Sequence, residues 1–129
     1  MPSTLENIYP KTNICLSNEI IKKGELIITE YVNEVTNKFE QTQWFIERDR
    51  LQVMFTKAVV LIASFERGEG DSGSRYAMAK AKQYGFVKRY VMFNEKVDNY
   101  NKMFGLNKTM ILEKAKILTE KSIKELIKI

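Results

Sequence analysis

Apolar residues along this chain form short runs separated by polar stretches. The clearest run is "KAVVLIAS", residues 57–64, which is β-branched and apolar almost throughout. An unalternating run of this length is typical of a strand covered on both faces, as in a parallel sheet. "ELIITEY", residues 25–31, and "VKRYVMF", residues 87–93, have the same character. The pattern therefore predicts three strands.

Segments with helical periodicity lie between and after these strands. Several of them are followed by glycine, which commonly ends a helix. Residues 94–108 read as a long loop, and residues 109–118 are ambiguous. We expect helices over residues 9–24, 44–55, 74–85 and 119–129.

Capping residues mark some of these helix ends. Thr12 or Asn13 is expected to cap the first helix, Gly24 to end it, and Thr119 to cap the last. In the helix over residues 74–85, small residues recur on one face, which lets a helix lie close to a sheet.

Helix and strand thus alternate along the chain, which is the pattern of an α/β fold. Such connections produce a mostly parallel sheet with right-handed crossovers. We predict a Rossmann-like, open, mostly parallel sheet of three to four strands flanked by helices, in a single domain over residues 1–129. A sheet this thin leaves an open edge that tends to pair with another chain, so we expect a homo-oligomer.

Composition narrows the chemistry. The 129 residues contain 21 Lys and Arg against 16 Asp and Glu, a net charge of +5, and no histidine. Catalysis and metal binding that depend on histidine are therefore excluded. The positive charge favours an anionic partner such as nucleic acid or a phosphorylated small molecule. It is equally compatible with an ordinary lysine-rich surface.

The chain shows no sign of a membrane or an oxidising compartment. Cys15 is the single cysteine, so neither an intrachain disulfide nor a cysteine metal cluster can form. No apolar stretch approaches the roughly 20 residues that span a bilayer, and the first ten residues lack the pattern of a secretion signal. We expect a cytoplasmic protein without a bound metal or cofactor.

A loop rich in glycine and serine, residues 64–73, joins the central strand to the next helix. In open α/β sheets, ligands bind beyond the carboxyl ends of the strands. Ser72, Gly73 and Ser74 would offer backbone N–H groups and two hydroxyls at a helix N-terminus, and Arg75 would add a permanent cation. The loop matches neither common phosphate-binding motif. Two interpretations of this loop therefore stay open: a phosphate-binding site, and a turn with a purely structural role.

Aromatic and charged side chains elsewhere also have two interpretations. Arg48 and Arg50 flank an expected helix start and either contact phosphate or pair with neighbouring carboxylates. Tyr9 precedes a proline in an extended segment, where stacking on a base is plausible. Trp44 and Phe45 fit a core better, because apolar residues surround them.

Five short motifs follow one another in an order typical of one protein family. They are Tyr9-Pro10 with Asn13, Gly24 with Glu30 and Tyr31, Arg48 with Arg50, Ser72-Gly73-Ser74, and Gly105 with Asn107. In this order the chain resembles the second half of the Rossmann-like domain of the DprA/Smf (DNA-processing protein A) family, within the SLOG superfamily. The family's first half, with its Gly-Ser-Arg turn and Ser-Gly-Gly-Ala segment, has no counterpart. We therefore expect a truncated half-domain that self-associates.

The resemblance implies a non-catalytic protein that binds nucleotide phosphate. The ligand is single-stranded DNA or a nucleotide-derived small molecule, held by the Ser72-Gly73-Ser74 loop. The resemblance extends the site to Arg48, Arg50, Tyr9 and Asn107, and Arg75 belongs to it as the cation next to the loop.

Three alternatives stay open. The first is a phage-type sponge that sequesters a nucleotide immune signal. The second is a phosphoribohydrolase acting on nucleoside monophosphates, although no glutamate follows Ser74 at the spacing that such enzymes use. The third is a structural interaction module that binds no ligand.

Overall fold

The fold is taken from a computed structural model that describes residues 3–34, 36–70 and 73–128. The chain divides into two compact units, Met1–Arg48 and Asp49–Ile129, with the boundary inside one helix, α2 (Lys38–Met54). The organisation of the whole chain as a single domain stays a prediction.

The first unit begins with the expected helix, but its start differs from the sequence prediction. A 3-10 turn, η1 (Lys11–Asn13), leads into α1 (Ile14–Lys22), and the Asn13 side chain makes no capping hydrogen bond. The expected side-chain cap was wrong, because the backbone of Asn13 is already helical and donates to Pro10 O at 2.9 Å. The expected end is confirmed: Gly24 has φ +74° and donates to Ile21 O.

The prediction of a strand over residues 25–31 was wrong. This segment is extended, but it pairs with no strand in the described part of the chain. Side chains fix it in place. The Thr29 hydroxyl donates to Ser3 O at 2.7 Å, and the Tyr31 ring stacks on Trp44 at 3.9 Å between centroids. Leu26 stays 79% exposed, so the apolar run is not buried as a strand between two layers would be.

α2 begins at Lys38, earlier than expected, because polar residues before it build a cap. Asn37 Oδ1 accepts from Glu40 N at 2.9 Å, and the Glu40 carboxylate accepts from Thr36 N and Oγ1, each at 2.8 Å. The bond from the Thr36 backbone, followed by the one from its hydroxyl, lowers the pKa of Glu40. Residues 38–43, which precede the expected helix over residues 44–55, therefore form the first turns of α2.

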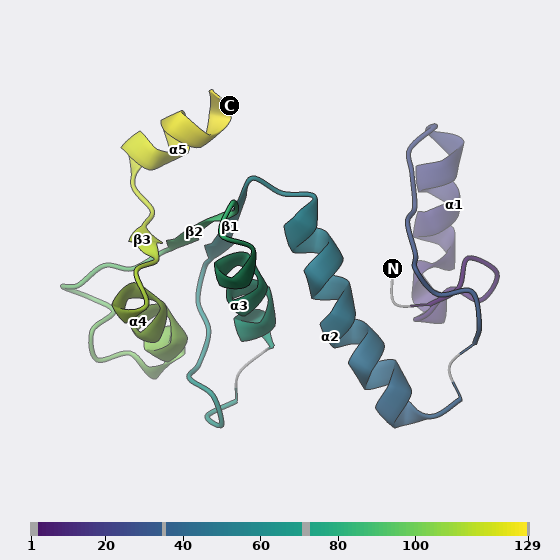
Figure 1. The fold of residues 1–129 in the computed structure, drawn as a ribbon, viewed down its shortest axis with the longest axis horizontal. Coiled ribbons are helices and arrows are strands. Elements are labelled where there is room, and N and C mark those ends of the chain that lie inside the picture. Colours follow the sequence, from purple (N-terminus) through teal and green to yellow (C-terminus); the bar gives the residue numbers. More distant parts are fainter. Residues whose placement is uncertain (1–2, 35, 71–72, 129) are drawn as a thin grey trace. The chain divides into compact units, whose positions relative to one another are not determined.

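The second unit is an open parallel sheet with helices, which confirms the predicted α/β fold (Figure 1). Its strands are β1 (Ala58–Leu61), β2 (Lys88–Val91) and β3 (Lys116–Ile117), in the order β1-β2-β3 and parallel throughout. β3 comes from the ambiguous segment. The helices are α3 (Ser74–Tyr84), η2 (Lys102–Phe104), α4 (Gly105–Leu112) and α5 (Glu120–Ile127).

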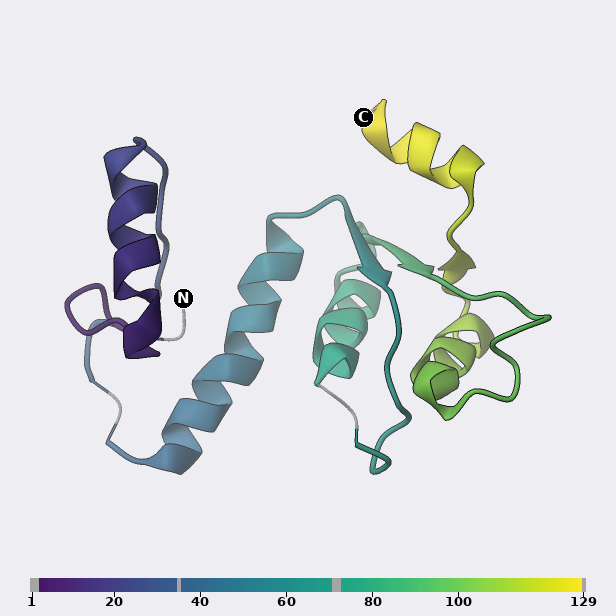
Figure 2. The same ribbon diagram turned by 180° about the vertical axis from the view of Figure 1, so that it is seen from behind.

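Helices α3 and α4 lie side by side against one face of this sheet (Figure 2). Leu61 and Val91 are a cross-strand pair whose side chains meet Met78 of α3 and Met110 of α4 in one buried cluster. A second cluster joins Val53 at the end of α2 to the other end of α3. Both clusters fix α3 relative to the strand ends, which is where the predicted site lies.

The C-terminal helix α5 confirms its predicted cap. The Thr119 hydroxyl accepts from Ser122 N at 3.2 Å, while Ser122 Oγ accepts from Thr119 N at 2.7 Å. The two residues thus satisfy each other's backbone donors. No helix within the described residues has both the length and the apolar character needed to cross a membrane.

Candidate nucleic-acid interface

A groove of about 590 Å³ runs between α3 and α4. We call it the α3–α4 groove. It opens beside the loop that follows β1, at the carboxyl ends of the strands, where ligands of open α/β sheets bind. Residues 75, 79, 82 and 83 of α3 form one wall, because positions separated by three or four residues share a helix face. Its lining residues are Glu66, Arg67, Arg75, Tyr76, Ala79, Lys82, Gln83, Leu106, Thr109, Met110 and Glu113.

Both carboxylates that line the groove, Glu66 and Glu113, form hydrogen bonds or ion pairs with other residues of the protein. Glu66 accepts from the Thr109 hydroxyl and from Arg67 N at 2.9 Å. Glu113 pairs with Lys82 at 2.8 Å and lies 3.8 Å from Arg89 Nη1. Arg89 Nη2 also donates to Glu113 O at 2.6 Å. Glu113 thus lies beside two basic side chains, whereas a hydroxyl and a backbone N–H donate to Glu66.

Arg75 has a defined position at the mouth. Its guanidinium carbon lies 4.6 Å from the centroid of the Tyr76 ring, and its Nη2 donates to the Tyr76 hydroxyl at 2.9 Å. Stacking and hydrogen bonding together hold this cation in the first turn of α3. Arg67, from the loop after β1, lies in the same lining and is exposed.

The predicted phosphate loop is described only in part. Ser72 lies outside the described residues. Gly73 precedes α3 with φ +80°, a left-handed conformation that favours glycine, and Ser74 is the first helical residue. No side chain of the N-cap residue closes this helix start, and Tyr76 N donates to Gly73 O at 2.9 Å. The phosphate-binding role of the loop stays a prediction.

Asn107, a predicted contact residue, is instead an internal cross-link. It is fully buried. Its Oδ1 accepts from Ser64 N at 3.2 Å, and its Nδ2 donates to Ile62 O at 2.9 Å and to Met92 O at 2.7 Å. The neighbouring Leu106 N donates to Ser64 O at 3.0 Å. The side chain thus joins the ends of β1 and β2 to α4, and our proposal assigns it no ligand.

Gly105 in the same motif has a packing role. A Cβ built there would lie 3.0 Å from Glu66 N and 3.1 Å from Glu66 Cβ, tighter than most Cβ contacts, so the neighbouring backbone would have to shift slightly. The absence of a side chain lets α4 approach the loop after β1. The Gly105–Asn107 motif therefore positions the floor of the groove.

The two arginines of α2 lie far from the helix start, so the sequence placement was wrong. Residues two apart on a helix point about 200° away from each other. Arg48 places its guanidinium carbon 5.6 Å from the centroid of the Phe45 ring, whereas Arg50 Nη1 contacts Met54 Sδ at 3.7 Å. The structure does not bring these two side chains together, and their contact with a ligand stays a prediction.

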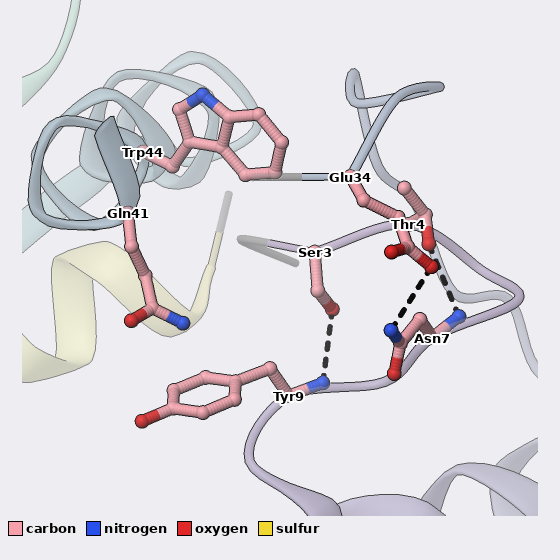
Figure 3. Close-up of a pocket in the computed structure, with 7 residues that line it drawn as sticks. All are labelled: Ser3, Thr4, Asn7, Tyr9, Glu34, Gln41 and Trp44. Atoms are coloured by element: carbon pink, nitrogen blue, oxygen red, sulfur yellow. Dashed lines mark hydrogen bonds between the residues drawn. The ribbon is translucent and has the colours of Figure 1, made fainter. Parts of the chain in front are cut away.

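Tyr9 belongs to a smaller pocket of about 100 Å³ in the first unit (Figure 3). Its backbone N–H donates to Ser3 Oγ at 3.2 Å, and its ring meets Phe45 edge-on, with 6.2 Å between centroids. Gln41 and Trp44 project from α2 to form the other wall. Tyr9 is 46% exposed, and stacking on a base stays a prediction.

The groove residues that sequence reasoning missed include Arg67, Lys82 and Thr109. Lys82 stands seven positions after Arg75 in an expected helix, so the helical spacing already placed both on one face. Arg67 lies in the loop that the sequence singled out. Thr109 gave no such signal, because it came from the ambiguous segment.

Among the described residues, no cluster of acidic, cysteine or histidine side chains could hold a metal ion.

A family model described as DNA recombination-mediator protein A matches residues 1–128. No curated protein and no solved structure gives a significant match. Because the family model covers nearly the whole sequence, the chain belongs to the DNA recombination-mediator protein A family.

Proposed function

We propose that this protein binds single-stranded DNA in the α3–α4 groove without catalysing a reaction on it. Membership of the family suggests a function in DNA processing or recombination. The observation that carries the proposal is the position of Arg75: a permanent cation stacked on Tyr76 in the first turn of α3, at the mouth of the groove.

A phosphate at this mouth meets favourable electrostatics. The helix dipole places about half a positive charge at the start of α3. Arg75 and Arg67 add two cations, and a guanidinium fork matches the oxygens of a phosphate. Ser72, Gly73 and Ser74 complete the phosphate contact in this proposal.

The interior of the groove suits the rest of a nucleotide. Leu106 and Met110 are nearly buried beneath it, and Ala79 leaves space between the helices. Sugars and bases can pack on this apolar floor while the phosphates follow the basic mouth. Lys82, at the far end of the wall, is exposed and paired with Glu113, so the proposal assigns the phosphate contacts to the arginines rather than to this lysine.

β1 stands at the edge of the sheet, with Ile62 beyond its end 67% exposed. An edge of this kind is compatible with the expected homo-oligomer. That expectation stays a prediction.

The test is fluorescence anisotropy of labelled (dT)20 over a salt series. We expect Arg67→Ala/Arg75→Ala to weaken binding about tenfold or more, and to reduce the slope of log K against log salt by about 1.4, that is about 0.7 for each lost phosphate contact. Lys96→Ala/Lys121→Ala is the control, because it removes the same charge from exposed positions outside the groove.

Two results would contradict the proposal. One is unchanged affinity in the double arginine variant, with the fold intact by circular dichroism. The other is displacement of (dT)20 by equal concentrations of a mononucleotide with little dependence on salt, which would favour a small nucleotide-derived ligand instead.

A further inference from the structure

A second surface lies where β1 and β2 begin, at the opposite end of these strands from the loop after β1. It is a hollow of about 590 Å³ lined by Met54, Phe55, Thr56, Lys57, Phe86 and Lys88. We call these six residues the aromatic–lysine patch. Phe55 is 72% exposed and Phe86 65% exposed, which is unusual for two phenyl rings lining one hollow.

The backbone holds both rings outward. Phe86 follows Gly85, whose φ is +71°, and Phe86 N donates to Tyr84 O at 2.8 Å. Its ring stacks on Tyr84, with 5.8 Å between centroids and an angle of 11°. Phe55 follows the end of α2, where Val53 is 1% exposed and anchored in the core. A hydrogen bond at Phe86 and core packing next to Phe55 therefore hold the backbone that carries the two exposed rings.

Basic residues surround these rings. Lys88 N donates to Lys57 O at 3.0 Å, so the two lysines start neighbouring strands side by side. Arg50 reaches the same place, since its Nη1 contacts Met54 Sδ at 3.7 Å. Among the described residues that line the patch, none is acidic. The charge is complementary to a polyanion.

We propose that the aromatic–lysine patch binds a second stretch of the same single-stranded nucleic acid, with bases stacked on Phe55 and Phe86 and phosphates on Lys57 and Lys88. Exposed aromatic rings beside cations form the usual platform for unpaired bases, because every base has a face that can stack. The inference rests on the proposed function, since it extends the strand that the α3–α4 groove holds.

The length of α3 sets the distance between the two surfaces. Arg75 lies in its first turn, and Phe86 follows its end. Eleven helical residues span about 16 Å, or about five nucleotides at a stacked spacing of about 3.4 Å. A trinucleotide is therefore too short to reach from the groove mouth to the patch, whereas a 20-mer is long enough.

The experiment compares (dT)3 and (dT)20 on the intact chain. Phe55→Ala/Phe86→Ala is expected to weaken (dT)20 binding at least about 25-fold, about fivefold for each lost stacking contact. The affinity for (dT)3 at the groove, followed by NMR chemical shifts of α3 amides, should stay unchanged. Tyr100→Ala is the control, because this ring is 95% exposed and lies outside both surfaces.

A second variant tests the lysines. Lys57→Gln/Lys88→Gln should reduce the salt slope for (dT)20 by about 1.4 and leave the slope for (dT)3 unchanged. Lys96→Gln/Lys121→Gln serves as the charge-matched control. Circular dichroism checks that each variant is folded.

The outcomes separate this inference from the proposed function. If (dT)20 binds the wild type and requires Arg67 and Arg75 but is indifferent to both patch variants, the patch proposal fails and the groove proposal stands. If the phenylalanine variant changes only the sedimentation behaviour of the protein, the patch is an interface between copies, which also overturns the proposal. If the wild type does not bind (dT)20, both proposals fail.

Discussion

Two motifs with similar composition lie at opposite ends of the loop that follows β1. One contacts the start of the loop from α4, and the other stands at its end, where α3 begins. Gly105–Asn107 and Gly73–Ser74 each combine a glycine with a small polar residue at the start of a helix. In the first, the asparagine is fully buried and bonded to the strand ends. In the second, the glycine adopts a left-handed conformation with no capping side chain.

The difference shows what decides whether a polar motif is structural. Both Nδ2 hydrogens of Asn107 go to backbone carbonyls, its Oδ1 accepts from the loop, and the residue is fully buried, so a ligand in solution does not reach it. Gly73 lies where α3 starts at the mouth of a groove. The first motif fixes the loop, whereas binding of an anion by the second stays a prediction.

The largest expected effect is the loss of the buried cross-link. Asn107→Ala leaves Ser64 N–H and two carbonyls without their partner in the core, which should lower the free energy of unfolding of the second unit by about 3–5 kcal/mol. Hydrogen exchange of the β1 and β2 amides measures the loss locally. Asn107→Asp should be no milder, because it places a charge against the same carbonyls. If either variant keeps full protection, the structural assignment of this motif is wrong.

The next effect concerns the close approach at Gly105. In Gly105→Ala the added Cβ meets the Glu66 backbone at 3.0 Å, so the loop or α4 must shift. We expect a loss of about 1–3 kcal/mol, as in overpacked sites, measured by urea denaturation. Gly68→Ala is an informative control, because its Cβ meets nothing within 4 Å and its cost comes from a φ of +84° alone. An unchanged or higher stability of Gly105→Ala would contradict a packing role for Gly105, because its helical φ of −55° imposes no backbone strain on alanine.

The same contrast explains how far the sequence could predict the fold. β1, β2, α3 and the Thr119 cap follow from local patterns, and the structure confirms them. Residues 25–31 have the composition of a strand but find no partner in the described chain, and a strand depends on pairing that composition alone cannot specify. β3 has only two residues, too few to produce a periodic signal.

The site was predictable to a similar extent. Arg75 and the loop before α3 follow from the general rule on strand ends, and the structure places Arg75 at a groove. The order of motifs alone could not show that Asn107 points inward or that Arg48 and Arg50 diverge. The first depends on how α4 packs, whereas the second follows from helical spacing, because both arginines lie inside α2.

The variants with the smallest expected effect on stability, at the two ends of α3, allow the most direct comparison of binding. Gly73 and Gly85 stand at the two ends of α3 with φ of +80° and +71°, so alanine at either position carries similar strain, about 1–2 kcal/mol. A Cβ at Gly73 meets the Tyr76 ring at an ordinary 3.7 Å, and one at Gly85 meets nothing within 4 Å. We expect matched losses of stability in urea, but only Gly73→Ala should weaken (dT)3 binding, by about tenfold, because it alters the helix start that faces the phosphate. If the two variants bind (dT)3 equally, the start of α3 takes no part in binding, and the groove must hold its ligand through the arginines alone.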